Sequence, residues 1–197
     1  NLDVFFSHGL ENLFFPIFGD SLLERGKAFV DTVIPELTRV LFDERSWLDF
    51  YLDRDIRVKT YGNLEKLDTA FPGHDLAGKI NRAVTVTSGC SSHTLYFGFF
   101  STPYAGLEMR EKLNGFVSVH GREPDYPELV ELYYGEKIPK ADFFINSIRT
   151  GGLGALPPLI TGKETKTYTL PAPAIYSLSG RTFREILYDI MFCPYYD

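Results

Sequence analysis

The residues best suited to chemistry lie in Ile148-Arg-Thr-Gly-Gly152, where an arginine leads directly into a turn of small residues. A guanidinium is permanently charged and carries a planar fork of donors, and glycine lets the backbone approach a ligand closely. This combination suits a phosphate or diphosphate group. The candidate substrate-binding residues are therefore Arg149, Thr150, Gly151 and Gly152. Short motifs also arise by chance, so an arginine that only pairs with a nearby carboxylate is the alternative.

The segment before Arg149 is apolar, which predicts a buried strand. Its sequence is Ala141-Asp-Phe-Phe-Ile-Asn-Ser147. Such a strand would place Arg149 near its carboxyl end, where open α/β sheets bind their ligands.

Strand and helix patterns alternate along the rest of the chain, which predicts an α/β fold with a mainly parallel central sheet flanked by helices. The other expected strands are Leu2–Phe6, Ile56–Gly62, Thr94–Phe100 and Thr165–Leu170. The first expected helix begins at Asp20 or Ser21 and runs to about Leu41, and a second begins at Ser46. Three more are expected at Gly73–Val86, Tyr104–Val119 and Pro127–Tyr134. No internal repeat or linker interrupts the pattern, so residues 1–197 are expected to form one domain.

The first residues read as a core strand with no loop or helix before them. A domain rarely starts inside its central sheet. We therefore expect further sequence ahead of Asn1 and a domain that is incomplete at its N-terminus.

The composition is typical of a globular protein, with 44% hydrophobic and 23% charged residues. No apolar run is long enough to span a bilayer. The net charge of −6 argues against a general nucleic-acid binder, because phosphate backbones are held by basic surfaces. Cys90 and Cys193 form no metal-binding pattern, and the expected compartment is a reducing cytoplasm.

Taken in order, these segments resemble the cis-prenyltransferases, the family of undecaprenyl diphosphate synthase. That family has a strand leading to Phe-Ser-x-Glu-Asn-Trp, a long helix, a strand ending in Gly-Asp, a strand running into Arg-Thr-Ser/Gly-Gly, and a closing Tyr-x-Glu-Leu-Tyr-Phe. The counterparts here are Phe6-Ser7 with Glu11-Asn12, Tyr61-Gly62-Asn63, Ile148-Arg-Thr-Gly-Gly152 and Phe183-Arg-Glu-Ile-Leu-Tyr188. Each motif is weak alone, but their order agrees over nearly the whole chain.

The resemblance implies an enzyme that condenses an allylic diphosphate with isopentenyl diphosphate, forms a Z double bond and releases diphosphate. Arg149 would bind isopentenyl diphosphate, Ser7 and Asn12 would be catalytic residues that bracket the reacting groups, and Glu185 would be a ligand of Mg²⁺. A homodimer or heterodimer is implied too, as is peripheral contact with a membrane through a lipid product. Two alternatives stay open: Ser7 and Asn12 as ordinary turn formers, and Glu185 as an exposed position on an edge strand.

Several departures from the family pattern bear on activity. The family's first strand ends in Asp-Gly-Asn-x-Arg, a motif that is absent from these 197 residues. The second arginine and the serine that usually follow the Gly-Gly turn are replaced by Leu153-Gly-Ala-Leu-Pro-Pro158. Three hypotheses follow: a prenyl-transferring enzyme, a non-catalytic subunit of a prenyltransferase dimer, or an unrelated α/β phosphate-binding protein.

Overall fold

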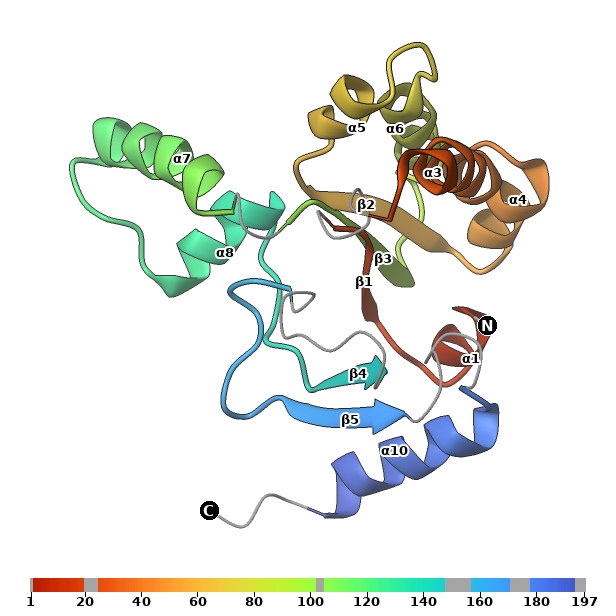
Figure 1. The fold of residues 1–197 in the computed structure, drawn as a ribbon. Coiled ribbons are helices and arrows are strands. Elements are labelled where there is room, and N and C mark those ends of the chain that lie inside the picture. The colour runs from red at the N-terminus through yellow and green to blue at the C-terminus, as the bar shows by residue number, and fades with distance from the viewer. Residues whose placement is uncertain (1, 20–24, 102–104, 148–156, 171–177, 194–197) are drawn as a thin grey trace.

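The computed structural model describes residues 2–19, 25–101, 105–147, 157–170 and 178–193. Its main part is a three-stranded parallel sheet with the strand order β1-β3-β2. A separate two-stranded parallel sheet is formed by β4 and β5 (Figure 1). The strands are β1 (Asn12–Phe18), β2 (Ile56–Gly62), β3 (His93–Phe99), β4 (Phe143–Ser147) and β5 (Lys166–Leu170). An α/β fold built on parallel strands is confirmed.

The three-stranded sheet is buried on both faces because its residues alternate between two cores. Leu95, Phe97 and Phe99 of β3 point into the larger core. Tyr96, between them, points into a second core on the opposite face. Such a strand reads as a continuous apolar run, and this is why β3 could be predicted from the sequence.

Four helices gather on the larger core, above the sheet in Figure 1. They are α3 (Lys27–Phe42), α4 (Arg45–Asp53), α5 (Glu65–Ala70) and α6 (Leu76–Val86). Helices α4 and α6 contact β2, and α3 lies against both α4 and α6. Ile34 of α3 and Ile80 of α6 are fully buried in this core.

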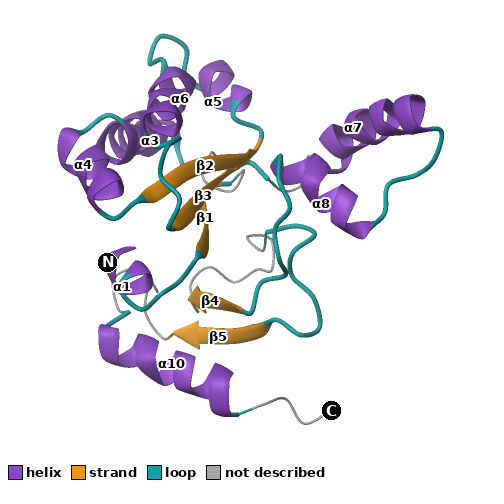
Figure 2. Ribbon diagram, turned by 180° about the vertical axis from the view of Figure 1, so that it is seen from behind, coloured by secondary structure: helices purple, strands orange, loops and turns teal. Residues whose placement is uncertain are grey.

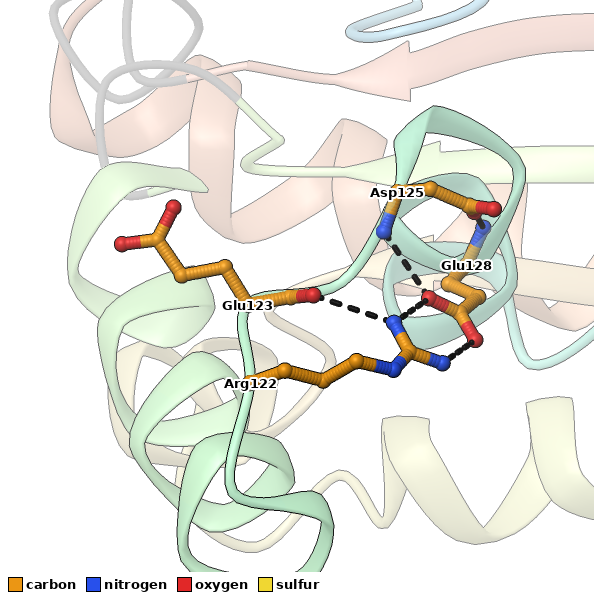
Figure 3. A network of polar contacts seen from close by, with 4 residues as sticks. All are labelled: Arg122, Glu123, Asp125 and Glu128. Carbon is orange, nitrogen blue, oxygen red and sulfur yellow. Dashed lines mark hydrogen bonds and ion pairs between the residues drawn. The ribbon is translucent and has the colours of Figure 1, made fainter.

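Helix α8 (Tyr126–Tyr134) packs on the opposite side with α7 (Ala105–His120) beside it. A capping box fixes the start of α8 (Figure 3). The Asp125 carboxylate accepts from the Glu128 N–H at 2.9 Å, and the Glu128 carboxylate accepts from the Asp125 N–H at 2.8 Å. Arg122 donates two further bonds of 2.7 Å to Glu128. The bonds to the Glu128 carboxylate, first those from Arg122 and then that from the Asp125 N–H, lower the pKa of Glu128 to about 2.

The two-stranded sheet is covered by α10 (Gly180–Phe192), while α1 (Leu2–Phe6) lies between this unit and the larger core. Phe183 of α10 is fully buried, and its ring meets Phe5 of α1 edge-on with the centroids 5.0 Å apart. Both views show α1 close to the start of α10 (Figures 1 and 2).

The expected strand at Leu2–Phe6 is wrong, because this segment is helix α1. Leu2 and Phe6 are both buried at a spacing of four, which is one face of a helix. Short apolar runs do not distinguish helix from strand. The first strand is Asn12–Phe18, which was not among the expected strands. Pro16 is tolerated there because β1 is an edge strand of its sheet.

Helix α6 begins at Leu76, later than expected, and follows Asp75, whose left-handed backbone has φ +50°. Helix α3 begins at Lys27, after Gly26, and the start expected at Asp20 or Ser21 lies outside the described residues. Helix α5 was not expected at all. The C-terminal segment with Glu185 is helical, so the alternative of an edge strand is also wrong.

Candidate active site at the carboxyl edge of the sheet

The candidate site lies where the strands of the larger sheet end, because parallel sheets bind ligands beyond their carboxyl ends. The strands β1, β3 and β2 end at Phe18, Phe99 and Gly62. Backbone hydrogen bonds continue past these ends. The Phe100 N–H donates to the Phe18 carbonyl at 2.7 Å, and the Asn63 N–H donates to the Phe99 carbonyl at 2.7 Å. These hydrogen bonds link the three strand ends into one continuous rim.

Gly62 is required by the shape of this rim. Its φ is +84°, and a Cβ at this position would lie 2.1 Å from the Phe99 carbonyl oxygen. The next residue, Asn63, accepts on its Oδ1 the N–H of Lys66, in the first turn of α5, at 3.0 Å. The Lys66 ammonium lies 4.8 Å from the centre of the Phe100 ring. The rim thus carries a cation beside a tight backbone turn.

A cavity of about 660 Å³ lies along the edge of β1 that faces away from β3. Its walls come from residues 9–16, from residues 138–146, from α1 and from Leu178. Most of the lining side chains are apolar, among them Leu13, Phe15 and Phe144. A water molecule takes about 30 Å³ of liquid volume, so this cavity is far larger than a packing defect.

The Arg149-Thr-Gly-Gly152 turn lies outside the described residues. The strand expected before it is present: β4 ends at Ser147, two residues before Arg149. The binding role of Arg149, Thr150, Gly151 and Gly152 therefore stays a prediction.

Ser7 and Asn12 lie at the other end of β1. Asn12 is the first residue of that strand and lines the cavity, while Ser7 is exposed just after α1. Ser7 Oγ lies 3.3 Å from His8 Nδ1, a spacing that suggests a nucleophile and its base. However, His8 Nδ1 is 2.8 Å from the Val4 carbonyl oxygen, which only accepts, so this nitrogen carries the proton and cannot take one from Ser7. The described geometry gives Ser7 and Asn12 the roles of loop and strand-end residues, and a catalytic role stays a prediction.

Glu185 lies on α10, and its side chain is 63% exposed. Its Oε1 accepts from Arg181 Nε at 3.0 Å, four residues earlier on the same helix. In the described part of the chain, no three His, Cys, Asp or Glu side chains come together as metal ligands. The described residues do not form a magnesium site around Glu185, and no step is assigned to a metal there.

One polar cluster was not expected from the sequence. Glu136 accepts hydrogen bonds from Arg57, Lys59 and Tyr96 on one face of the sheet. Burial raises the pKa of Glu136, but the bonds from Lys59 and Tyr96 and the two positive charges outweigh burial and hold this pKa below its usual value. The sequence did show that Arg57 and Lys59, two residues apart on β2, share one face of the strand. It did not show their partner Glu136, which lies 79 positions after Arg57.

Comparison with solved structures shows which fold the chain has. The chain superposes on a probable undecaprenyl diphosphate synthase from Campylobacter jejuni with a TM-score of 0.75, covering 97% of this chain and 85% of the other at 17% identity. Lavandulyl diphosphate synthase from Lavandula x intermedia, solved with dimethylallyl diphosphate, gives a TM-score of 0.72 over 100% of this chain and 82% of its own, at 14% identity. The chain therefore has the cis-prenyltransferase fold, and the resemblance drawn from its motifs is confirmed.

Two curated relatives are more similar in sequence. Tuberculosinyl adenosine transferase of Mycobacterium tuberculosis is 31% identical over 196 residues, which are 99% of this chain and 64% of the relative. The (+)-kolavelool synthase of Herpetosiphon aurantiacus is 26% identical over 195 residues, or 97% of this chain and 62% of the relative. The chain thus spans under two thirds of the length of either relative. No family model matches it.

The parallel sheet flanked by helices does not favour the hypothesis of an unrelated α/β protein. None of the described helices is long and apolar enough to cross a membrane.

Proposed function

We propose that the protein transfers a prenyl group from an allylic diphosphate to an acceptor and releases diphosphate. The observation that carries the proposal is the 31% identity, over nearly the whole chain, to an enzyme named for transferring a tuberculosinyl group to adenosine. The cis-prenyltransferase fold and a parallel strand that leads to Arg149 support it.

The proposed reaction breaks the bond between the allylic carbon and the diphosphate oxygen. Diphosphate leaves with the electron pair, the acceptor forms a new bond to the allylic carbon, and the acceptor then loses a proton. The protein's contribution would be to hold the leaving group, because charge grows on its oxygens as the bond breaks. Arg149 would instead hold the diphosphate of an isopentenyl diphosphate acceptor, since its guanidinium can bind two oxygens of one diphosphate. Magnesium, if required, would accompany the diphosphate, whose oxygens are the ligands that Mg²⁺ prefers.

The acceptor divides the proposal into two forms. Isopentenyl diphosphate as acceptor would give a longer prenyl diphosphate with a new Z double bond, as the motifs imply. A nucleoside acceptor would give a prenylated nucleoside, as the name of the relative from Mycobacterium tuberculosis implies for that protein. The replacement of the family's second arginine by Leu153–Pro158 favours an acceptor with less negative charge than a diphosphate.

The test is to incubate the intact protein with Mg²⁺ and allylic diphosphates of increasing length, with isopentenyl diphosphate, adenosine or neither. Released diphosphate and the masses of the products are measured. We expect diphosphate release with at least one donor, and the product mass identifies the acceptor. If folded protein releases no diphosphate with any donor and acceptor, the enzyme hypothesis is wrong. The hypothesis of a non-catalytic subunit then remains.

Arg149→Ala should lower turnover by at least tenfold, the effect of about 1.4 kcal/mol of lost charge-assisted bonding. Arg184→Ala is the matched control, because Arg184 is an exposed arginine on the outside of α10 and should leave turnover unchanged. Equal activity of both variants would show that Arg149 does not bind the diphosphate.

A further inference from the structure

The residue after β3 has an unusual backbone conformation. Phe100 has φ +46°, although its side chain is bulky and the residue is only 1% exposed. Left-handed backbone is uncommon outside glycine, and in a bulky residue it is a genuine outlier. Such strain persists only where the surrounding structure holds it in place, and it is concentrated at functional sites. The turn at Phe100 is therefore a candidate functional feature of the rim.

This turn changes the side of the sheet on which the Phe100 ring lies. Successive side chains of a strand point to opposite faces, and along β3 Phe97 and Phe99 belong to the larger core while Tyr96 belongs to the second core. Phe100 also belongs to the larger core, so the alternation ends at this residue. The left-handed backbone thus places the ring on the side of the sheet that is covered by α3, α4, α5 and α6.

On this side, the Phe100 ring supports Lys66. The Lys66 ammonium lies 4.8 Å from the ring centre, and the side chain is half-buried. A cation over an aromatic face is attracted by the quadrupole of the ring, and more strongly where water is excluded. The Asn63 N–H donates to the Phe99 carbonyl, and Asn63 Oδ1 accepts the Lys66 N–H, so the backbone that carries Lys66 is tied to the end of β3. The ammonium therefore has a defined place at the carboxyl edge.

Lys66 is the cation that the described part of the rim supplies. Of the described residues within four positions after the ends of β1, β2 and β3, Lys66 alone is positively charged. Glu65 precedes it but is exposed, and consecutive side chains of a helix do not face each other. Parallel sheets bind ligands beyond this edge, and a lysine ammonium binds phosphate groups as a point charge. The edge is thus suited to one anionic group.

We propose that Lys66 binds the diphosphate of the allylic donor and stabilises it as it leaves, with Phe100 as the positioning residue that orients the ammonium. This inference rests on the proposed prenyl transfer and adds a residue to it. When the carbon–oxygen bond breaks, the diphosphate oxygen keeps the electron pair, so negative charge grows where the ammonium lies. The strand that leads to Arg149, β4, belongs to the other sheet, so the donor and the acceptor would each meet a cation from a different sheet.

Binding of inorganic diphosphate with Mg²⁺ to the intact protein, measured by titration calorimetry, tests the site without turnover. Lys66→Met keeps an apolar chain on the Phe100 ring but removes the charge, and we expect about a tenfold loss of affinity. Lys66→Arg keeps the charge and should stay within about threefold of the wild type. Phe100→Leu should weaken binding by about threefold, because the charge remains but the ring is lost.

Lys140→Gln is the matched control. The Lys140 ammonium also lies near an aromatic ring, 5.7 Å from the centre of Tyr126, but it belongs to the segment before β4. Its loss should leave diphosphate binding unchanged. Urea unfolding of each variant shows that the protein is folded, and equal affinity of folded Lys66→Met and wild type would overturn the proposal.

Turnover separates the donor from the acceptor. The donor's diphosphate is present with every acceptor, so Lys66→Met should slow diphosphate release about equally with isopentenyl diphosphate and with adenosine. A loss confined to isopentenyl diphosphate would place Lys66 at the acceptor and overturn the proposal. If the wild type binds diphosphate through Lys66 but releases none from any donor, prenyl transfer is wrong and the binding site stands. If Lys66→Met turns over as fast as the wild type, prenyl transfer stands and the role of Lys66 is wrong.

Discussion

Gly62 and Phe99 approach each other so closely at the carboxyl edge of the sheet that no side chain fits between them. A Cβ on Gly62 would lie 2.1 Å from the carbonyl oxygen of Phe99, and 3.0 Å from the Cα of Ser101. Both neighbours are backbone atoms, which cannot rotate away. The end of β2 is therefore shaped by contact as well as by its left-handed φ of +84°.

Gly62→Ala should destabilise the protein by both effects. The left-handed backbone costs a non-glycine residue about 1–2 kcal/mol. The clash should add about 1–3 kcal/mol, as overpacking does in a core. Urea unfolding gives the loss of free energy.

The matched control is Gly73→Ala. Gly73 has nearly the same φ, +88°, but no atom lies within 4 Å of the added Cβ. This control should show the conformational cost alone. Equal losses for the two variants would mean that the rim relaxes to accept a side chain at Gly62.

The Glu136 cluster ties the segment after α8 to the sheet, and it makes a second prediction. Glu136→Gln keeps the shape of the side chain but leaves the charges of Arg57 and Lys59 without their partner. A hydrogen bond to a charged group contributes about 1.5–3 kcal/mol, so we expect a loss of that order at neutral pH. Glu131→Gln, at an exposed position of α8, should change stability by less than about 0.5 kcal/mol.

The stability lost in the Glu136→Gln variant should depend on pH in a defined direction. The pKa of Glu136 in the folded protein lies below its ordinary value of 4.5. The advantage of the wild type is therefore fully present above pH 4.5 and is lost as the pH falls through the folded pKa. An advantage that grows on acidification would show that the folded protein raises the pKa of Glu136 and does not lower it.

The elements that the sequence predicted best are those with a long and unambiguous pattern. The strand Ile56–Gly62 was predicted with its observed bounds, because its apolar positions alternate with polar ones that are themselves half-buried. The segment Leu2–Phe6 failed because a short, mostly apolar run fits one turn of helix as well as a strand. That error moved Ser7 and Asn12 to the wrong end of a strand in the sequence-based site.

The Glu136 cluster and the turn at Gly62 were less predictable, since their residues meet through long-range packing. Glu136 contacts Arg57 across 79 positions of sequence and Tyr96 across 40. No local pattern reports such a contact. The turn at Gly62 had a local signal, a glycine at the end of a strand, but its contact with Phe99 depends on the register of β2 against β3.

Asp55 provides a third prediction, at the amino end of the sheet. Its carboxylate accepts from the N–H groups of Ser91 and Ser92, at 3.1 and 2.8 Å, and from the hydroxyl of Ser92 at 2.5 Å. These bonds, led by the Ser92 hydroxyl, lower the pKa of Asp55 from 3.8 to about 2. The bonds join the turn before β3 to the start of β2.

Asp55→Asn should therefore be less stable than the wild type at neutral pH, and the difference should vanish on acidification. A carboxyl group with a lowered pKa stabilises the fold above its unfolded pKa, here 3.8, and this stabilisation is lost as the pH falls toward 2. Asparagine tolerates the left-handed backbone of residue 55, whose φ is +50°, so the substitution changes the charge and not the turn. Urea unfolding between about pH 2 and 7 measures the effect. If the difference in stability between the two proteins stays constant over this pH range, its cause is packing and not the charge of Asp55.

Glu185 provides the last prediction, because the motif and the structure lead to different expectations for it. A magnesium ligand should be directed toward a cluster of oxygen donors. Glu185 instead is 63% exposed and pairs with Arg181 on its own helix. From this geometry we expect Glu185→Gln and Arg181→Gln to have the same small effect on stability, about 0.2–0.5 kcal/mol, as usual for such pairs. Neither should change the magnesium concentration at which diphosphate release is half-maximal. If Glu185→Gln alone raises that concentration, the motif-based role is correct, and α10 must present Glu185 to the substrate in the active protein.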